Sequence, residues 1–171
     1  MDISKFKTHD WLVIAGGIGM IIFGLFLDWW KVSGFGGGAN AFDFFFTGTL
    51  PWLLLVAAAV VTVLLAMEKL DSKSLPWPLV IALATIVAAV LLLIRFLFNP
   101  GAPDGVDRGI GLILSFIVGL VSAAGGIMGF MATGGKIADF ADMNKMKSAF
   151  DKDGKSVDGG SAMPPPPPPP M

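Results

Sequence analysis

The chain has 171 residues, of which 54% are hydrophobic and only 15% are charged, and its formal net charge is −1 at pH 7. An average soluble domain carries about 25% charged residues, so this hydrophobic surplus predicts an integral membrane protein. The absence of Cys excludes disulfide frameworks, thiol redox chemistry and Cys-ligated metal sites. The single His excludes bis-His haem ligation within one chain, and the near-neutral charge argues against nucleic acid as a partner.

Four apolar segments, separated by stretches rich in Gly, Pro and charge, predict four transmembrane helices, at about residues 11–27, 50–67, 79–98 and 109–131. Each is close to the roughly 20 residues that an α-helix needs to cross the bilayer core. The lipid bilayer is therefore the predicted environment, since helices satisfy their own backbone hydrogen bonds there. The predicted fold class is all-α, with residues 11–131 forming an integral membrane four-helix bundle.

The distribution of Lys and Arg predicts the orientation. Four spans place residues 1–10, the loop between the second and third spans, and the tail on one side of the membrane. That side has more basic residues than the other, which carries only Lys31 and Arg108 near the spans. By the positive-inside rule, we expect a multi-pass protein of the bacterial plasma membrane with both termini in the cytoplasm.

Arg95 is the only ionisable residue inside a predicted span. It lies about 24 Å along the third span, near the outer interface, so we expect its guanidinium to snorkel toward water or to pair with Asp28. Intramembrane charges are also functional candidates. The alternative interpretation is therefore a ligand or ion site, with Arg95 and Asp28 lining an outer vestibule of a channel or small-solute transporter.

No Asp, Glu or His lies within any predicted span. A proton-coupled transporter generally needs such a group as a relay. We predict no catalytic residues, no cofactor and no metal site, and therefore no enzyme. A lipid-acting enzyme at the outer face is the least favoured alternative, because nothing in the spacing pairs its candidate acid–base residues, Asp28, Asp43, Asp104 and Asp107.

Small residues recur four positions apart in two of the spans. This spacing places small side chains on one helix face, so that two backbones can approach closely. We expect packing within the bundle, and the alternative is a homo- or hetero-oligomer interface through the fourth span. The residues are Ala15 and Gly19 in the first span and Ser115, Gly119, Ala123, Gly125 and Gly129 in the fourth.

The tail, residues 132–171, has a different composition. Apolar residues on one face predict a short amphipathic surface helix at 137–150, and the small, polar remainder predicts disorder over 151–171. The chain closes on a run of prolines that forms a stiff polyproline II rod. Such rods dock in aromatic-lined grooves of partner proteins, or remain solvated. The residues are Pro164, Pro165, Pro166, Pro167, Pro168, Pro169 and Pro170.

Residues 26–34, which read FLDWWKVSG, are followed at 40–43 by Asn-Ala-Phe-Asp. This part of the chain resembles functionally uncharacterised small four-helix integral membrane proteins of actinobacteria. Those proteins combine a Trp-containing end of the first span, a Ser- and Gly-rich outer loop and an Asn-Ala-aromatic-Asp element before the second span. The resemblance covers the first two spans and implies fold and location, without an activity.

These observations favour a non-enzymatic function. We expect a small membrane module that acts as a scaffold or as an accessory subunit of a larger membrane assembly. Its protein partner would bind the polyproline tail or the fourth span.

Overall fold

The computed structural model describes residues 5–32, 38–71, 75–98, 106–142, 144 and 147–148. Four helices dominate it: α1 (Thr8–Phe26), α2 (Leu50–Ala66), α3 (Trp77–Phe98) and α4 (Ile110–Ala132). A π-helical turn, η3 (Phe45–Thr49), leads directly into α2. With η3 counted as the start of the second helix (Phe45–Ala66), all four helices are long and apolar enough to cross a membrane, which confirms the prediction of four apolar helices.

The helices begin and end where the chemistry of the chain changes. At the start of α1, the Asp10 carboxylate accepts a hydrogen bond from the backbone N–H of Lys7 at 2.8 Å, as in a capping box. Pro51 and Pro78 lie in the first turns of α2 and α3, where a missing N–H costs no helical hydrogen bond. Just after α2, Glu68 adopts the left-handed conformation, with φ of 58°.

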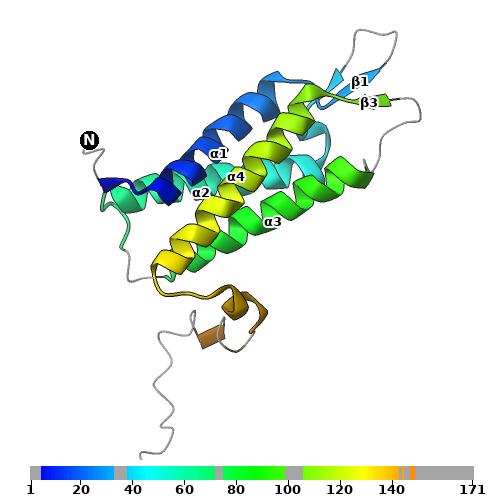
Figure 1. Cartoon of the computed structure of the whole chain (residues 1–171). Coiled ribbons are helices and arrows are strands. Elements are labelled where there is room, and N and C mark those ends of the chain that lie inside the picture. The colour runs from blue at the N-terminus through cyan, green and yellow to red at the C-terminus, as the bar shows by residue number, and fades with distance from the viewer. Residues whose placement is uncertain are drawn as a thin grey trace, which may run out of the picture.

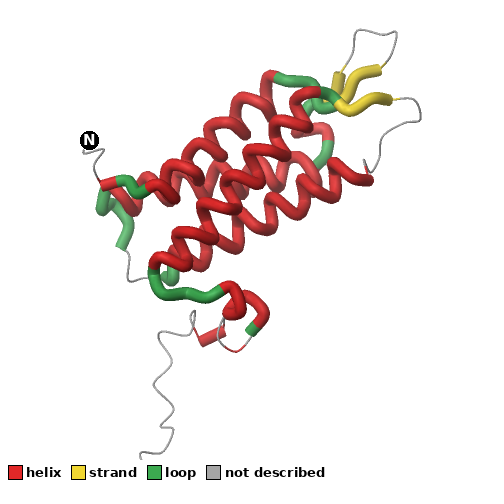
Figure 2. Tube along the Cα trace, viewed as in Figure 1, coloured by secondary structure: helices red, strands yellow, loops and turns green. Residues whose placement is uncertain are grey.

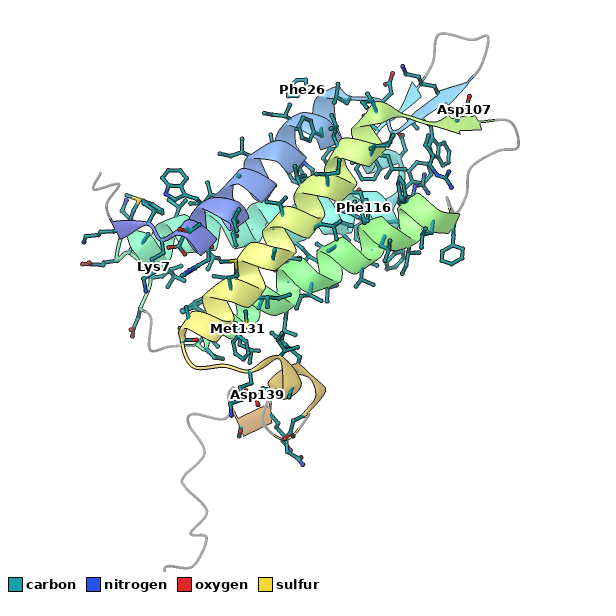
Figure 3. The ribbon with its side chains drawn as sticks, viewed as in Figure 1. Lys7, Phe26, Asp107, Phe116, Met131 and Asp139 are labelled. Atoms are coloured by element: carbon teal, nitrogen blue, oxygen red, sulfur yellow. The ribbon has the colours of Figure 1, made fainter. Side chains whose placement is uncertain are left out.

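The contacts among the helices close a ring, and Figure 1 shows α1, α4 and α3 in this order in front of α2. Both α1 and α3 pack between α2 and α4, on opposite sides of the ring. One end of the bundle, which we call the sheet end, joins α1 to α2 and α3 to α4. The other, the pocket end, holds the starts of α1 and α3 and the ends of α2 and α4. Lys7 lies at the pocket end and Asp107 at the sheet end (Figure 3).

A small antiparallel sheet, which the all-α prediction did not include, covers the sheet end (Figure 2). Its central strand, β1 (Trp30–Val32), pairs with β2 (Gly38–Ala39) on one side and with β3 (Val106–Arg108) on the other. The backbone of Trp29 extends the ladder in both directions, since its N–H donates to Ala39 and its carbonyl accepts from Gly109, both at 2.7 Å. The sheet therefore ties together the two loops at this end of the bundle.

The core is built from one large side chain of each helix and from residues beneath the sheet. Met20, Leu55, Leu92 and Leu112 are fully buried and belong to one cluster that also contains Trp29. Large aliphatic side chains also cover the outer surfaces of the helices, including Ile18, Leu53, Val87 and Ile117. Helices that are apolar on every side are typical of membrane spans.

The chain turns away from the bundle after α4. Gly134 adopts a φ of 92°, a conformation that favours glycine, and a short 3₁₀ helix, η4 (Ile137–Ala141), follows. The ring of Phe140 packs against that of Phe130 at the end of α4, with centroids 4.8 Å apart. The 3₁₀ helix occupies the start of the predicted surface helix at 137–150. Most of the remainder of that segment, and all of 151–171 with its proline run, lies outside the described residues.

Candidate functional site

Arg95 lies beneath the sheet instead of reaching water. Its side chain is fully buried, and its guanidinium carbon is 4.4 Å from the centroid of the Trp30 ring and 3.6 Å from that of Phe44. These distances are those of cation–π contacts. The expected snorkelling does not occur because β1 and the segment before η3 fold over the end of α3 and place aromatic rings around the cation.

Asp28 does not join Arg95. Both residues are described, and no ion pair connects them. The Asp28 side chain is exposed and lies against Gly38 of β2, where a Cβ would collide with its carboxylate. The two residues that were expected to form a pair, or to line an outer vestibule, thus lie in different surroundings, since Asp28 is exposed and Arg95 is buried.

The other acidic residues of the sheet end are spread over different elements. Asp43 caps the short 3₁₀ helix η2 (Ala41–Asp43), because its carboxylate accepts the backbone N–H of Asn40 at 2.7 Å. Asp107 is exposed on β3, opposite Lys31 of β1. Asp104 lies outside the described residues.

The small residues of α4 pack inside the bundle. Ser115, Gly119, Ala123 and Gly125 are buried. A Cβ at Gly119 would lie 2.7 Å from Leu92 Cδ1 of α3, and one at Gly125 would lie 2.9 Å from the backbone oxygen of His9 in α1. These glycines therefore let α4 approach two helices of its own chain.

In α1 the packing face differs from the predicted one. Gly19 is buried against Val118 of α4, but Ala15 is exposed. The close approaches are made instead by Gly16, which faces Ser122 of α4, and by Gly17, which faces Ala59 of α2. The adjacent glycine pair is the signal that could have identified this face, because it allows one turn of α1 to touch two helices at once.

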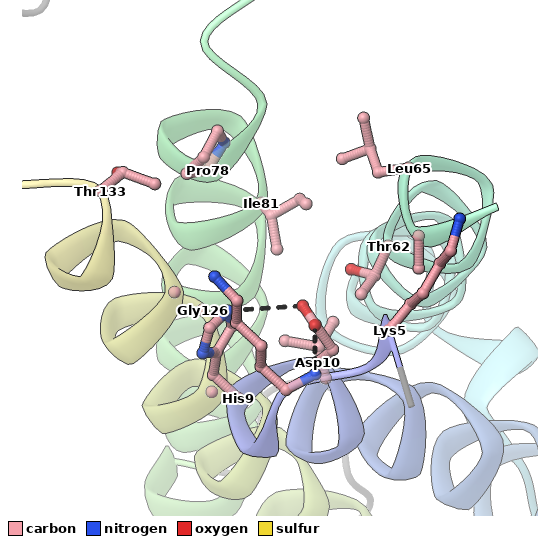
Figure 4. A pocket seen from close by; sticks show the side chains of 14 residues that line it. Lys5, His9, Asp10, Thr62, Leu65, Pro78, Ile81, Gly126 and Thr133 are labelled. Atoms are coloured by element: carbon pink, nitrogen blue, oxygen red, sulfur yellow. Dashed lines mark hydrogen bonds and ion pairs between the residues drawn. The ribbon is translucent and has the colours of Figure 1, made fainter. Parts of the chain in front are cut away.

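A pocket with about 200 Å³ of room opens at the pocket end, between all four helices (Figure 4). Its apolar walls include Val13, Leu65 and Ile81, and three glycines of α4 line the side opposite α2. Gly129, one of the predicted packing residues, is among them, and a Cβ there would lie 3.0 Å from the imidazole Cδ2 of His9. The polar lining residues are Lys5, Lys7, His9, Asp10, Thr62 and Thr133.

The hydrogen bonds of the pocket define its polar character. Asp10 accepts the Lys7 N–H through one oxygen and lies 3.5 Å from His9 Nε2 through the other. The hydroxyls of Thr62 and Thr133 donate to carbonyls of their own helices, Ala58 at 2.8 Å and Phe130 at 2.7 Å. Each hydroxyl oxygen therefore has only lone pairs to offer to a bound molecule.

The rim of the pocket carries an ion pair. Lys5 Nζ lies 2.6 Å from Glu68 Oε1, and this contact joins the N-terminal segment to the loop after α2. The hydrogen bond and the charge of Lys5 lower the pKa of the Glu68 carboxyl. Within the described part of the chain, Lys7 forms no ion pair.

The basic residues of this N-terminal segment indicated the orientation of the chain. The pocket could not be predicted from the sequence, because His9 and Thr62 lie on separate helices whose ends meet only after folding. In the described ranges, no group of three or more His, Asp or Glu side chains could hold a metal ion. Comparisons of the chain with protein-family models, with curated proteins and with solved structures find no match.

Proposed function

We propose that this chain is a non-enzymatic multi-pass protein of the bacterial plasma membrane that acts as a scaffold or accessory subunit of a larger assembly. In this proposal the pocket end and both termini face the cytoplasm, and the sheet end faces outward. The described basic residues at the chain ends and loops support this orientation, since Lys5, Lys7, Lys69 and Lys136 all lie at or near the pocket end.

The observation that carries the proposal is the closely packed interior. Gly16 against Ser122 and Gly17 against Ala59 bring α1 into contact with two helices in the middle of the bundle. The fully buried Met20, Leu55, Leu92 and Leu112 fill the space toward the sheet end. A bundle packed in this way has its chemically useful groups at its two ends, which favours binding to other molecules over transport through the centre.

The channel alternative gains no support from the sheet end. An outer vestibule needs an accessible Arg95, whereas this side chain is fully buried between aromatic rings. Proteoliposome flux distinguishes the two functions. We expect no solute flux above that of protein-free vesicles, and a flux that Arg95→Ala abolishes would support the channel.

The partner of the proposed scaffold is expected to bind the proline run at Pro164–Pro170. The small residues of α4 are already used within the chain, so we propose the proline run as the binding segment. The test is affinity purification in a mild detergent followed by mass spectrometry. A matched control replaces the prolines by a Gly-Ser segment of the same length, which removes the polyproline rod and keeps the reach of the tail.

We expect a stoichiometric protein partner that is lost with the Gly-Ser tail. A partner retained by both proteins would overturn the role of the prolines but not that of the scaffold. Isolation of the native chain as a monomer with no partner would count against the scaffold itself.

A further inference from the structure

We propose that the pocket at the pocket end binds the phosphate group of a small phosphate ester, presented either as a lipid headgroup or as a free solute. This inference goes beyond the scaffold function and does not depend on it. It rests on three features that coincide there: a cavity, a Lys side chain without an ion pair among the described residues, and hydroxyl oxygens that can accept hydrogen bonds.

The donors come from the N-terminal segment and the first turn of α1. Lys7 lines the pocket and its ammonium forms no ion pair with the described residues, and the imidazole of His9 is held between Gly129 and Asp10. The first turn of α1 begins at the same place, and its backbone N–H groups add positive potential. Cationic side chains beside a helix start are the usual partners of a phosphate group.

The single carboxylate of the pocket does not cancel this charge. Asp10 is oriented by the Lys7 backbone N–H and faces the imidazole of His9, so both of its oxygens are already engaged. Lys5 is already paired with Glu68, so Lys7 is the charged lining residue that has no ion-pair partner among the described residues. An anionic ligand is therefore favoured over a cationic one.

Two hydroxyl oxygens of the lining, one on α2 and one at the end of α4, select for groups that donate hydrogen bonds. The hydroxyl oxygens of Thr62 and Thr133 have already donated their hydrogens, so they accept from a ligand hydroxyl or amine. The room of about 200 Å³ corresponds to about seven water molecules at roughly 30 Å³ each. A phosphate that carries a small hydroxylated or amino group, such as a glycerol phosphate, has this size and this pattern of donors and acceptors.

The test uses the full-length protein in dodecyl maltoside, with two arms that distinguish the sources. In the first, glycerol phosphate is titrated and followed by ³¹P NMR. In the second, native mass spectrometry counts the molecules of phosphatidylglycerol that remain bound after delipidation and re-addition. Saturable binding in the first arm identifies a free solute as a sufficient ligand. Retention in the second arm alone identifies a lipid headgroup, and either result supports the proposal.

Two variants and one control locate the binding. Lys7→Gln removes one ammonium from the pocket and should weaken binding about tenfold or more, as expected for a hydrogen bond to a charged group. Ala66→Phe fills the pocket from its rim without changing any charge, and should abolish binding. Lys69→Gln removes the same charge from an exposed position at the same end of the bundle, and should change the affinity less than about twofold.

Three results would overturn the proposal. The first is the absence of saturable binding of either probe. The second is an equal loss of affinity in Lys7→Gln and Lys69→Gln, which would indicate diffuse attraction to a basic surface. The third is unchanged binding in Ala66→Phe, provided that its melting temperature without ligand matches that of the native protein. If Ala66→Phe does not fold, the comparison of the two Lys variants still decides.

Discussion

Arg95 shows how a charged residue is accommodated near the end of an apolar helix. Its sequence position indicated a side chain that reaches water, because only about one further turn of α3 follows it. Instead, the rings of Trp30 in β1 and of Phe44, just before η3, cover its guanidinium. A guanidinium is more weakly hydrated than an ammonium and stacks on aromatic faces, so Arg suits this buried position better than Lys does.

Replacing Arg95 should destabilise the protein. Arg95→Ala removes two cation–π contacts and leaves a cavity beneath the sheet, so we expect the free energy of unfolding to fall by about 2–4 kcal/mol. Arg95→Met keeps most of the side-chain volume and should recover part of that loss. The measurement is unfolding of the detergent-solubilised protein in increasing dodecyl sulfate, followed by Trp fluorescence.

Arg108→Ala is the matched control for this prediction. Arg108 is exposed, and its guanidinium carbon is 5.5 Å from the centroid of the Phe96 ring. Its removal should change stability by no more than about 0.5 kcal/mol. Equal effects of the alanine substitutions at 95 and 108 would show that burial between the two rings contributes nothing to stability.

The Lys5–Glu68 ion pair predicts a pH dependence at the pocket end. Lys5 lowers the pKa of Glu68 below its ordinary value of 4.5 in the folded protein. The pair therefore stabilises the fold above pH 4.5, and this contribution is lost as the pH falls through the lowered pKa. Both side chains are largely exposed, so the effect should be small and should weaken with salt.

Titration of the Glu68 carboxyl by ¹³C NMR tests this prediction directly. We expect a midpoint below 4.5 in the native protein and a return toward 4.5 in Lys5→Gln. Lys7→Gln, two residues away, should leave the midpoint unchanged. An identical midpoint in the native protein and in Lys5→Gln would show that the ion pair does not form in solution.

At the scale of elements, helix packing depends on where small residues meet. A Cβ at Gly16 would collide with Ser122 Cβ and lie 3.2 Å from the backbone oxygen of Val118. The neighbouring Ala15 is exposed. A larger side chain should therefore fit at position 15 but not at position 16. The spacing of small residues had instead indicated Ala15 as a packing residue.

Gly16→Leu and Ala15→Leu test this difference as a matched pair. Leucine at position 16 gains about 0.8 kcal/mol of helix propensity but overpacks the α1–α4 contact, which costs about 1–3 kcal/mol or more. We expect a net loss of about 1–2 kcal/mol. Ala15→Leu should stay within about 0.5 kcal/mol of the native protein in the same dodecyl sulfate unfolding assay. The reverse order would mean that α1 packs through its other face.

The helices could be predicted from the sequence and the sheet could not. Each helix is an apolar segment of about 17 residues or more, a strong local signal that does not depend on the rest of the chain. The strands are two or three residues long, and β1 pairs with a strand that is more than 70 positions away. No alternation of polar and apolar residues can be detected over such lengths. The environment of Arg95 depends on those strand pairings, so it could not be predicted from the sequence either.

At the scale of the whole molecule, the bundle has two chemically different ends. The sheet end has a framework of three strands over a buried hydrophobic cluster that contains Trp29. The pocket end is open, and four helix ends surround a space with basic and acidic groups. The charge asymmetry that predicts the orientation could be read from the sequence. The convergence of Lys7, His9 and Thr62 on one pocket could not, because it requires the helices to be arranged in a ring.

The orientation of these two ends in the membrane can be tested cleanly because the chain contains no Cys. A single introduced Cys is then the only site for a maleimide. Asp107→Cys places a thiol on an exposed strand at the sheet end, and Lys69→Cys places one on the exposed loop after α2. We expect a membrane-impermeant maleimide to label Asp107→Cys in intact cells and Lys69→Cys only after lysis, with the Cys-free parent as the blank.

The opposite labelling pattern would show that the protein has the inverted orientation, and the proposed phosphate ester site would then face outward. Labelling of both positions in intact cells would show that α3 does not cross the membrane.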